Sequence, residues 1–247
     1  MKQWLNCTVT TIKHWNERLY SLFVECPELA FTPGQFTFLA LDIDGKHIAR
    51  PYSLVNNPAD SQLEFFFSTV ANGGLSTRLA SLNRGDAIAV QAKASGHMTL
   101  ASIADADELW LIGTGTGIGP YISMLRTEEP WTRFRRITLV YGARERSDFA
   151  YQQALEGFSQ RKSGQFQAIF CASREQDENA IAGRIQHAFE CGELEAKAGI
   201  SITPASSQIL LCGHSGMIHA MQVQLEAIGL RKNKRKTPGH ITIEKYW

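Results

Sequence analysis

The first hundred residues alternate between hydrophobic and polar positions in short segments. Segments 4–12, 19–25, 36–43, 62–70 and 87–91 have this pattern, and Asp44-Gly45 is a tight-turn signal that leads into a further segment carrying Arg50. A period of two is typical of strands with one buried face. Six short strands separated by turns predict an antiparallel barrel or sandwich, with one helix at 76–82.

The pattern changes near residue 101, where apolar segments begin to alternate with helical ones. Strands are expected at 109–113, 137–141, 166–172 and 209–213, and helices at 121–127, 151–160, 184–190 and 217–228. This β-α-β order predicts a doubly wound parallel sheet with helices on both faces. Since segment 94–107 separates the two patterns, we expect one domain over 1–100 and a second over 101–247.

Composition and charge exclude several classes of protein. Hydrophobic residues make up 44% and charged residues 20% of the 247 positions, as in soluble globular proteins. No apolar run approaches the roughly 20 residues of a membrane-spanning helix. The first residues lack the pattern of a signal peptide, so the cytoplasm is the expected location. The net charge of +1 gives no general attraction to nucleic acid.

The five cysteines are scattered at positions 7, 26, 171, 191 and 212, with no C-x-x-C pair. Such an odd and scattered set argues against a disulfide framework, a zinc site and a cysteine-ligated iron–sulfur cluster. Any redox chemistry must therefore come from a bound organic cofactor.

A cation, a ring and a hydroxyl lie within four positions at Arg50, Tyr52 and Ser53. On an extended strand Arg50 and Tyr52 share one face and Ser53 points to the other. This arrangement fits a flat ligand that bears phosphate, with the arginine on the phosphate, the ring against the ligand and the hydroxyl at its edge. It fits an ordinary strand with one exposed arginine and one half-buried tyrosine equally well.

Two glycine turns precede predicted helices. The run 113–119 ends a strand and begins a helix, where backbone N–H groups and the helix dipole can hold a phosphate. The turn Gly73-Gly74-Leu75-Ser76 opens the helix of the first domain and can cradle another phosphate pair. Ser76 can also serve simply as a helix cap.

Arginines follow the strands of the second domain. Arg144 and Arg174 come after predicted strands, Ser173 adjoins Arg174, and Arg184 opens a helix. Because loops after the strands of a doubly wound sheet line one crevice, these residues can clamp the phosphomonoester that distinguishes NADP(H) from NAD(H). For each arginine taken alone, an ordinary surface position is the simpler interpretation, and Arg174 with Ser173 beside it is the strongest candidate of the three.

The chain ends in alternating apolar residues followed by Tyr246 and Trp247. Chain ends are usually polar and frayed. The two rings either complete the core on a last strand or stack on a flat ligand, and we favour stacking. Cys212 ends the last predicted parallel strand, where it is either a small buried hydrophobe or a residue of the crevice.

Together these stretches resemble the ferredoxin–NADP reductase family, and most closely its bacterial ferredoxin/flavodoxin–NADP reductases. The R-x-Y-S stretch at 50–53, the glycine turn before Leu75-Ser76, G-T-G-x-x-P at 115–120, C-G-x-x-x-M at 212–217 and the terminal E-x-Y-W occur in the family's order and spacing over the whole chain. Gly119 stands where many members have Ala, and Pro51 stands where other residues are common. The resemblance implies a six-stranded Greek-key FAD-binding barrel followed by an NADP-binding α/β domain whose tail returns to the flavin.

The resemblance also implies roles for individual residues. Arg50 would meet the FAD pyrophosphate, Tyr52 would stack on the isoalloxazine ring and Ser53 would lie near its reactive N5. Cys212 and Glu244 would line the nicotinamide site, and Tyr246 would cover the other flavin face; with Ser53 they form the implied catalytic set. In full, the implied FAD residues are Arg50, Pro51, Tyr52, Ser53, Phe66, Gly74, Leu75, Ser76, Thr116, Tyr246 and Trp247, and the implied NADP residues are Ala143, Arg144, Ser173, Arg174 and Arg184.

The implied activity is reversible electron transfer between NADP(H) and ferredoxin or flavodoxin, by hydride transfer at flavin N5 followed by single-electron steps. A monomer is expected. The basic block 231–236, with Arg133, Arg135 and Arg136, would dock an acidic carrier by electrostatic steering, unless it is a solvated loop. Two alternatives remain: a reductase of the same fold that serves free flavin or an oxygenase component, and a non-catalytic subunit of a larger complex.

Overall fold

The computed structural model describes residues 3–70 and 74–246 and divides into two compact units. The first unit contains the residues up to Thr99 together with 119–127, and the second contains 100–118 and the residues from 128 onward. The segment directly after the second glycine run therefore packs with the first unit, although its sequence lies within the second pattern. No helix among the described residues is long and apolar enough to cross a membrane.

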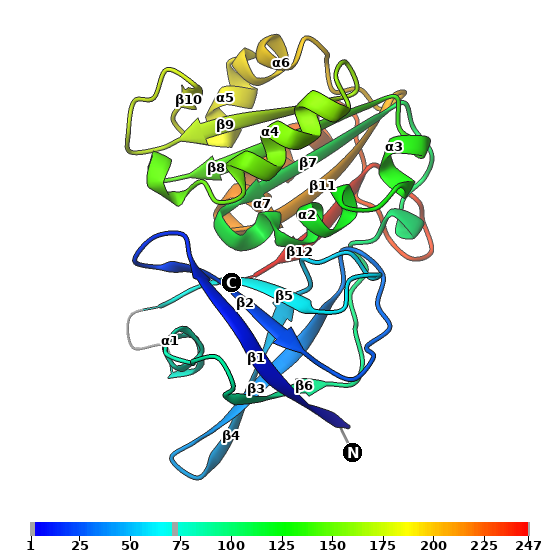
Figure 1. Ribbon diagram of the computed structural model, residues 1–247. Helices are drawn as coiled ribbons and strands as arrows, with labels where there is room; N and C mark the ends of the chain where they lie inside the picture. Colours follow the sequence, from blue (N-terminus) through cyan, green and yellow to red (C-terminus); the bar gives the residue numbers. More distant parts are fainter. Residues whose placement is uncertain (1–2, 71–73, 247) are drawn as a thin grey trace. The chain divides into compact units, whose positions relative to one another are not determined.

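The first unit is built on one antiparallel sheet of six strands (Figure 1). The strands are β1 (Trp4–His14), β2 (Leu19–Glu25), β3 (Phe36–Ile43), β4 (Lys46–Ser53), β5 (Leu63–Ser68) and β6 (Ala87–Gln91). Their order in the sheet is β4-β3-β6-β1-β2-β5, and a bridge between Leu54 and Phe65 joins its two ends. This is the predicted Greek-key barrel, to which α1 (Gly74–Ala80) and α2 (Gly119–Leu125) belong.

The expectation about the cysteines is wrong for one pair. Cys7 on β1 and Cys26, which directly follows β2, form a disulfide with their Cα atoms 4.5 Å apart. Because Thr8 lies opposite Glu25 in the antiparallel register of β1 and β2, the two cysteines are cross-strand neighbours. Their separation of 19 residues in the chain gave no sign of this, since only the register of the two strands brings them together.

The second unit contains a parallel sheet of six strands. These are β7 (Glu108–Thr114), β8 (Arg136–Ala143), β9 (Phe166–Ala172), β10 (Ala180–Ala182), β11 (Ser207–Gly213) and β12 (Ile241–Lys245), in the order β10-β9-β8-β7-β11-β12. The chain runs outward from β7 to β10 and then returns to β11 on the other side of β7. In such a doubly wound sheet, ligands bind outside the carboxyl ends of the strands where the direction reverses, here at β7 and β11.

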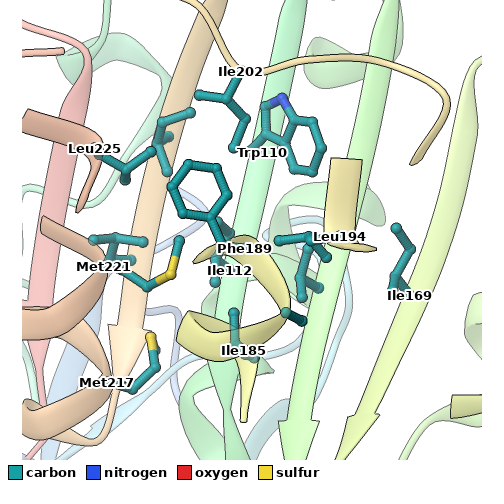
Figure 2. Packing of buried hydrophobic residues seen from close by; sticks show 14 of the residues in the cluster. Trp110, Ile112, Ile169, Ile185, Phe189, Leu194, Ile202, Met217, Met221 and Leu225 are labelled. Carbon is teal, nitrogen blue, oxygen red and sulfur yellow. The ribbon is translucent and has the colours of Figure 1, made fainter. Parts of the chain in front are cut away.

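Helices cover both faces of this sheet (Figure 1). They are α3 (Glu129–Arg133), α4 (Gln152–Arg161), α5 (Ile185–Glu190), α6 (Glu193–Ala198) and α7 (Ser215–Ala227), with 3₁₀ turns η1 (Leu100–Ser102), η2 (Gly115–Ile118) and η3 (Arg146–Asp148). On one face, Trp110 and Ile112 of β7 pack against Phe189, Leu194 and Leu225 (Figure 2). On the other face, Phe158 of α4 lies against the ring of Phe166 on β9. The short elements α3, β10 and α6 were not predicted, because so few residues display no clear period.

Candidate active site

The end of β4 carries four of the predicted flavin residues in the first unit. Arg50 and Pro51 are exposed, Tyr52 is half-buried with its ring edge-on to Phe67 at 5.9 Å, and Ser53 is buried. Burial raises the pKa of Tyr52 to about 12, and the charge of Arg50 partly opposes that rise. That the Arg50 charge acts on Tyr52 agrees with the two side chains lying on the same face of the strand. The Tyr52 ring is thus neutral at physiological pH.

Phe66 lies on β5 and is already covered within the first unit. Only 4% of its surface is exposed, and its ring meets Trp15 edge-on at 6.4 Å. The Trp15 indole N–H in turn donates to the Ser21 hydroxyl at 3.1 Å. Phe66 therefore contributes first to packing, and any contact with a ligand would involve the small exposed part of the ring.

The glycine turn of the first unit is described from Gly74 onward, since residues 71–73 lie outside the described part. Leu75 is buried in the barrel core, and the Ser76 hydroxyl accepts a hydrogen bond from the Val70 N–H at 3.3 Å. Outside its chain neighbours and the backbone of its own helix, a Cβ added at Gly74 would meet no atom of the described residues within 4 Å. Packing inside the protein therefore does not require a glycine here, whereas the close approach of a ligand to the backbone would.

In the second glycine turn, backbone conformation favours glycine at one position and packing within the second unit requires it at another. Gly115 has a φ of 55°, and a Cβ on Gly117 would lie 2.7 Å from the carbonyl oxygen of Cys212. A Cβ on Gly213 would lie 2.3 Å from the Thr114 hydroxyl. The loops after β7 and β11 thus touch backbone to backbone at the reversal point of the sheet. Thr116 is buried in η2 between Gly115 and Gly117.

Three predicted catalytic residues gather at the ends of β11 and β12. Cys212 lies opposite Glu244 in the parallel register, and the Tyr246 N–H donates to the Gly213 carbonyl at 3.3 Å. Burial, reinforced by the Glu244 charge, raises the pKa of Cys212 well above its usual range, and a hydrogen bond from the Tyr246 side chain opposes that rise. Cys212 is therefore a thiol with little nucleophilic character. Trp247 lies outside the described residues.

Glu244 has a buried acceptor atom that no described residue satisfies. Its Oε1 is buried and has no hydrogen-bond partner among the residues that the structure describes. Burial raises the pKa of this carboxyl to about 7. Because buried polar atoms in proteins are nearly always paired, an unpaired oxygen here fits the donor of a ligand, such as a carboxamide N–H.

The predicted NADP arginines stand on adjoining loops of the second unit. The Ser173 hydroxyl donates to the Ala143 carbonyl at 3.1 Å, and the Arg174 N–H donates to the Arg144 carbonyl at 2.8 Å. These bonds bring the loops after β8 and β9 side by side. Arg184 is the exposed residue before α5, and Arg144 and Arg174 are exposed as well. Within the described part of the chain, the three guanidinium groups have no ion-pair partner.

A cavity of about 650 Å³ opens beside this pair of loops. Arg146 also lines it, but its guanidinium lies 3.4 Å from Asp177, so Arg174 is the available cation. The sequence did not single out the other lining residues, of which Glu175 follows β9 and the rest follow β8. Tyr151, which adjoins the lining residue Gln152, has a φ of 61°. The full lining is Glu145, Arg146, Ser147, Phe149, Gln152, Arg174 and Glu175.

The predicted docking residues separate into two kinds. All cations of the block 231–236 are exposed, as is Arg135. Arg133 instead donates to the carbonyls of Leu100 and Ile103 at 2.6 Å each and pairs with Asp105 at 2.7 Å. Arg133 thus fixes the start of the second unit, and its guanidinium is not available to a partner. The described residues contain no cluster of His, Cys, Asp and Glu that fits a metal ion.

Comparison with known proteins agrees with both halves of the chain. The oxidoreductase FAD-binding domain matches residues 7–99, and the oxidoreductase NAD-binding domain matches residues 111–223. Flavodoxin/ferredoxin–NADP reductases of Shigella flexneri and Escherichia coli are 39% identical over 248 residues, covering 100% of both chains, and a ferredoxin–NADP reductase of Azotobacter vinelandii is 30% identical over 247 residues, covering 96% of this chain and 95% of the other.

A solved structure shows the same fold. The ferredoxin NADP⁺ reductase of Neisseria gonorrhoeae, with bound FAD and NADP, superimposes with a TM-score of 0.95 at 24% identity, covering 100% of both chains. The matches along the whole length thus agree with the architecture of both units. The chain belongs to the flavodoxin/ferredoxin–NADP reductase family.

Proposed function

We propose that this protein is an FAD-dependent oxidoreductase that transfers electrons reversibly between NADP(H) and ferredoxin or flavodoxin. The observation that carries the proposal is the buried Glu244 Oε1, which has no hydrogen-bond partner among the described residues and lies beside Cys212 at the carboxyl end of the parallel sheet. It supports a nicotinamide at the reversal point of a doubly wound sheet. The names of the relatives supply the electron carriers.

The residues of the first unit have the chemistry that FAD requires. Arg50 is exposed and offers a cation to the pyrophosphate, and the open space at Gly74 allows the backbone to approach a phosphate. Tyr52 offers a neutral ring to the isoalloxazine, and Ser53 offers a hydroxyl at its edge. Leu75, Ser76, Phe66 and Pro51 complete the proposed FAD residues of the first unit. Thr116, Tyr246 and Trp247, which lie outside that unit in the sequence, belong to the proposed FAD set as well. When bound, FAD accepts a hydride from NADPH and returns its electrons singly.

The residues of the second unit supply orientation for the nicotinamide nucleotide. Glu244 accepts a hydrogen bond and, with a pKa of about 7, can also hold a proton. Cys212 remains a neutral, compact contact surface, and the ring of Tyr246 occupies the region beside it until the substrate displaces it. Arg144, Ser173, Arg174 and Arg184, with Ala143, clamp the 2′-phosphate end and favour NADP(H) over NAD(H). We assign the FAD-binding part to 1–100 and the NADP-binding part to 101–247.

We also propose that the exposed cations of 231–236, with the exposed Arg135 and the half-buried Arg136 but without Arg133, dock an acidic carrier. Monomeric state and cytoplasmic location remain predictions from the sequence.

The visible spectrum of the purified protein tests the proposed function. A yellow protein is expected whose flavin absorbance NADPH bleaches under argon, much faster than NADH does, and which oxidised flavodoxin or ferredoxin restores. A colourless protein, or one that NADPH leaves oxidised, would contradict the enzyme assignment and favour a non-catalytic subunit. Faster reoxidation by free flavin or an oxygenase component than by either carrier would contradict the assigned acceptor.

A further inference from the structure

A buried ion pair joins β5 to the end of α2 within the first unit. Arg126 Nη1 lies 2.5 Å from Glu64 Oε2, and the side chains of Arg126 and Glu64 are 27% and 3% exposed. Phe23 of β2 lies opposite Glu64 in the antiparallel register. A carboxylate buried to this degree is costly unless a cation and hydrogen bonds compensate it. Packing of the barrel alone therefore does not explain why the Arg126–Glu64 ion pair is present.

The same guanidinium also fixes the chain just beyond the proposed flavin residue Ser53. Arg126 Nη1 donates to the Val55 carbonyl at 3.0 Å, and the Val55 N–H donates to the Glu64 carbonyl at 2.9 Å. The N–H of Leu54 donates to the Gln35 carbonyl at 3.0 Å. Both polar groups of the Val55 backbone are thus held by Glu64 and Arg126, two residues from Ser53.

Helix α2 is fastened to the same segment along its length. A Cβ at Gly119, its first residue, would lie 3.3 Å from Val55 Cγ2 and 4.0 Å from Ser53 Cβ. The Ser123 hydroxyl donates to the Asn56 carbonyl at 2.8 Å, and the Asn57 side-chain amide donates to the Arg126 carbonyl at 2.7 Å. Segment 53–57 and α2 thus form one hydrogen-bonded block, in which Arg126 makes the bonds to both Val55 and Glu64.

We propose that Arg126 is a positioning residue for the proposed reaction: with Glu64, it fixes the end of β4 and thereby the place of the Ser53 hydroxyl. The inference rests on the proposed function, in which Ser53 meets the flavin. Arg126 touches no reacting atom in this account. Its contribution is to hold Ser53 in place, and small misplacements of a reacting group are enough to slow catalysis strongly.

The test separates positioning from stability with a double variant. Arg126→Met alone leaves the Glu64 charge buried without its cation and should destabilise the fold severely. Glu64→Gln with Arg126→Met removes both charges, so the unfolding midpoint should return close to that of the original protein, while the Val55 carbonyl still lacks its donor. Gln165→Met is the matched control, because Gln165 bridges the carbonyls of Trp131 and Phe134 in the second unit.

Two readouts are compared, hydride transfer from NADPH in single turnover and hydrogen exchange at the Val55 amide in the full chain with and without FAD. In the double variant we expect hydride transfer at least about tenfold slower, with the KM for NADPH within about twofold of the original value. We expect faster exchange at Val55 without a fall in global stability. The Gln165→Met variant should lose stability and keep both its transfer rate and its Val55 exchange.

Hydride transfer that recovers with stability in the double variant would overturn the proposal, because the pair would then be only structural. Unchanged exchange at Val55 would overturn it as well, whether or not FAD is bound. Ser53→Ala serves as the reference for the proposed function. If that variant transfers hydride at the original rate, the role given to Ser53 is wrong, and hydrogen exchange alone then decides whether Arg126 fixes the segment.

Discussion

Because the pKa of Glu244 is raised, the contribution of this carboxyl to the free energy of unfolding should fall as pH rises through neutrality. The substitution Glu244→Gln should remove this fall. The carboxyl titrates at its ordinary value of 4.5 in the unfolded chain and at about 7 in the folded protein, because burial penalises the charged form. Between these values the folded state binds the proton more tightly than the unfolded state. The contribution of Glu244 to stability is therefore greatest below the unfolded pKa and falls as pH rises through the folded one.

The size of the effect follows from the shift itself. Each pKa unit corresponds to about 1.4 kcal/mol, so a rise from 4.5 to about 7 amounts to about 3 kcal/mol. The variant Glu244→Gln has no carboxyl to ionise and should lack this loss. Its free energy of unfolding relative to the original protein should therefore increase by about 3 kcal/mol between about pH 4.5 and pH 8.

Urea unfolding at several pH values, followed by circular dichroism at one saturating FAD concentration, measures this difference. Glu156→Gln, at an exposed position on α4, is the matched control and should show a difference from the original protein that hardly changes with pH. Any constant offset from the amide introduced in the Glu244→Gln variant cancels, since only the change with pH is compared. Parallel pH curves for this variant and the original protein would refute the reasoning that the Glu244 carboxyl is strongly desolvated.

Three further predictions concern the proposed nucleotide, tail and carrier sites. Arg174→Ala should raise the KM for NADPH about tenfold to a hundredfold, since a charged hydrogen bond is worth about 1.5–3 kcal/mol, while the KM for NADH stays nearly constant; equal effects on both in steady-state assays would speak against a 2′-phosphate contact. Removing residues 246–247 should alter the rate of hydride transfer and the preference for NADPH over NADH, and unchanged stopped-flow kinetics would rule out a moving ring. Replacing Lys234 and Lys236 by Glu should slow carrier association roughly tenfold at low salt and flatten its salt dependence, whereas Arg161→Glu on α4 should not; equal salt slopes would place docking elsewhere.

The fold could be predicted from the sequence because its signals are periodic and local. Strands such as β2 and β9 have the expected bounds, and the turn at Asp44-Gly45 links β3 to β4 as expected. The β-α-β order from residue 108 onward was sufficient to predict the doubly wound sheet. The disulfide between Cys7 and Cys26 escaped prediction, since it depends on how two strands align.

The candidate site was predictable in its motifs and less so in its physical detail. The glycines at 115 and 117 were attributed to a ligand, yet Gly117 is also needed for contact with the Cys212 backbone in the protein itself. Arg133 looked like a surface cation, although its guanidinium binds two carbonyl groups. The partnership of Glu64 with Arg126 joins residues 62 positions apart, and no local pattern in either segment indicates it.

The most direct test of the account is an anaerobic double-mixing experiment. The protein is first reduced with one equivalent of NADPH and then mixed with oxidised flavodoxin or ferredoxin, while flavin and carrier absorbance are followed together. The account predicts fast bleaching by NADPH, followed by carrier reduction at a rate that rises with carrier concentration and falls with salt. A flavin that NADPH does not reduce, or a reduced protein that passes its electrons to neither carrier, would contradict it.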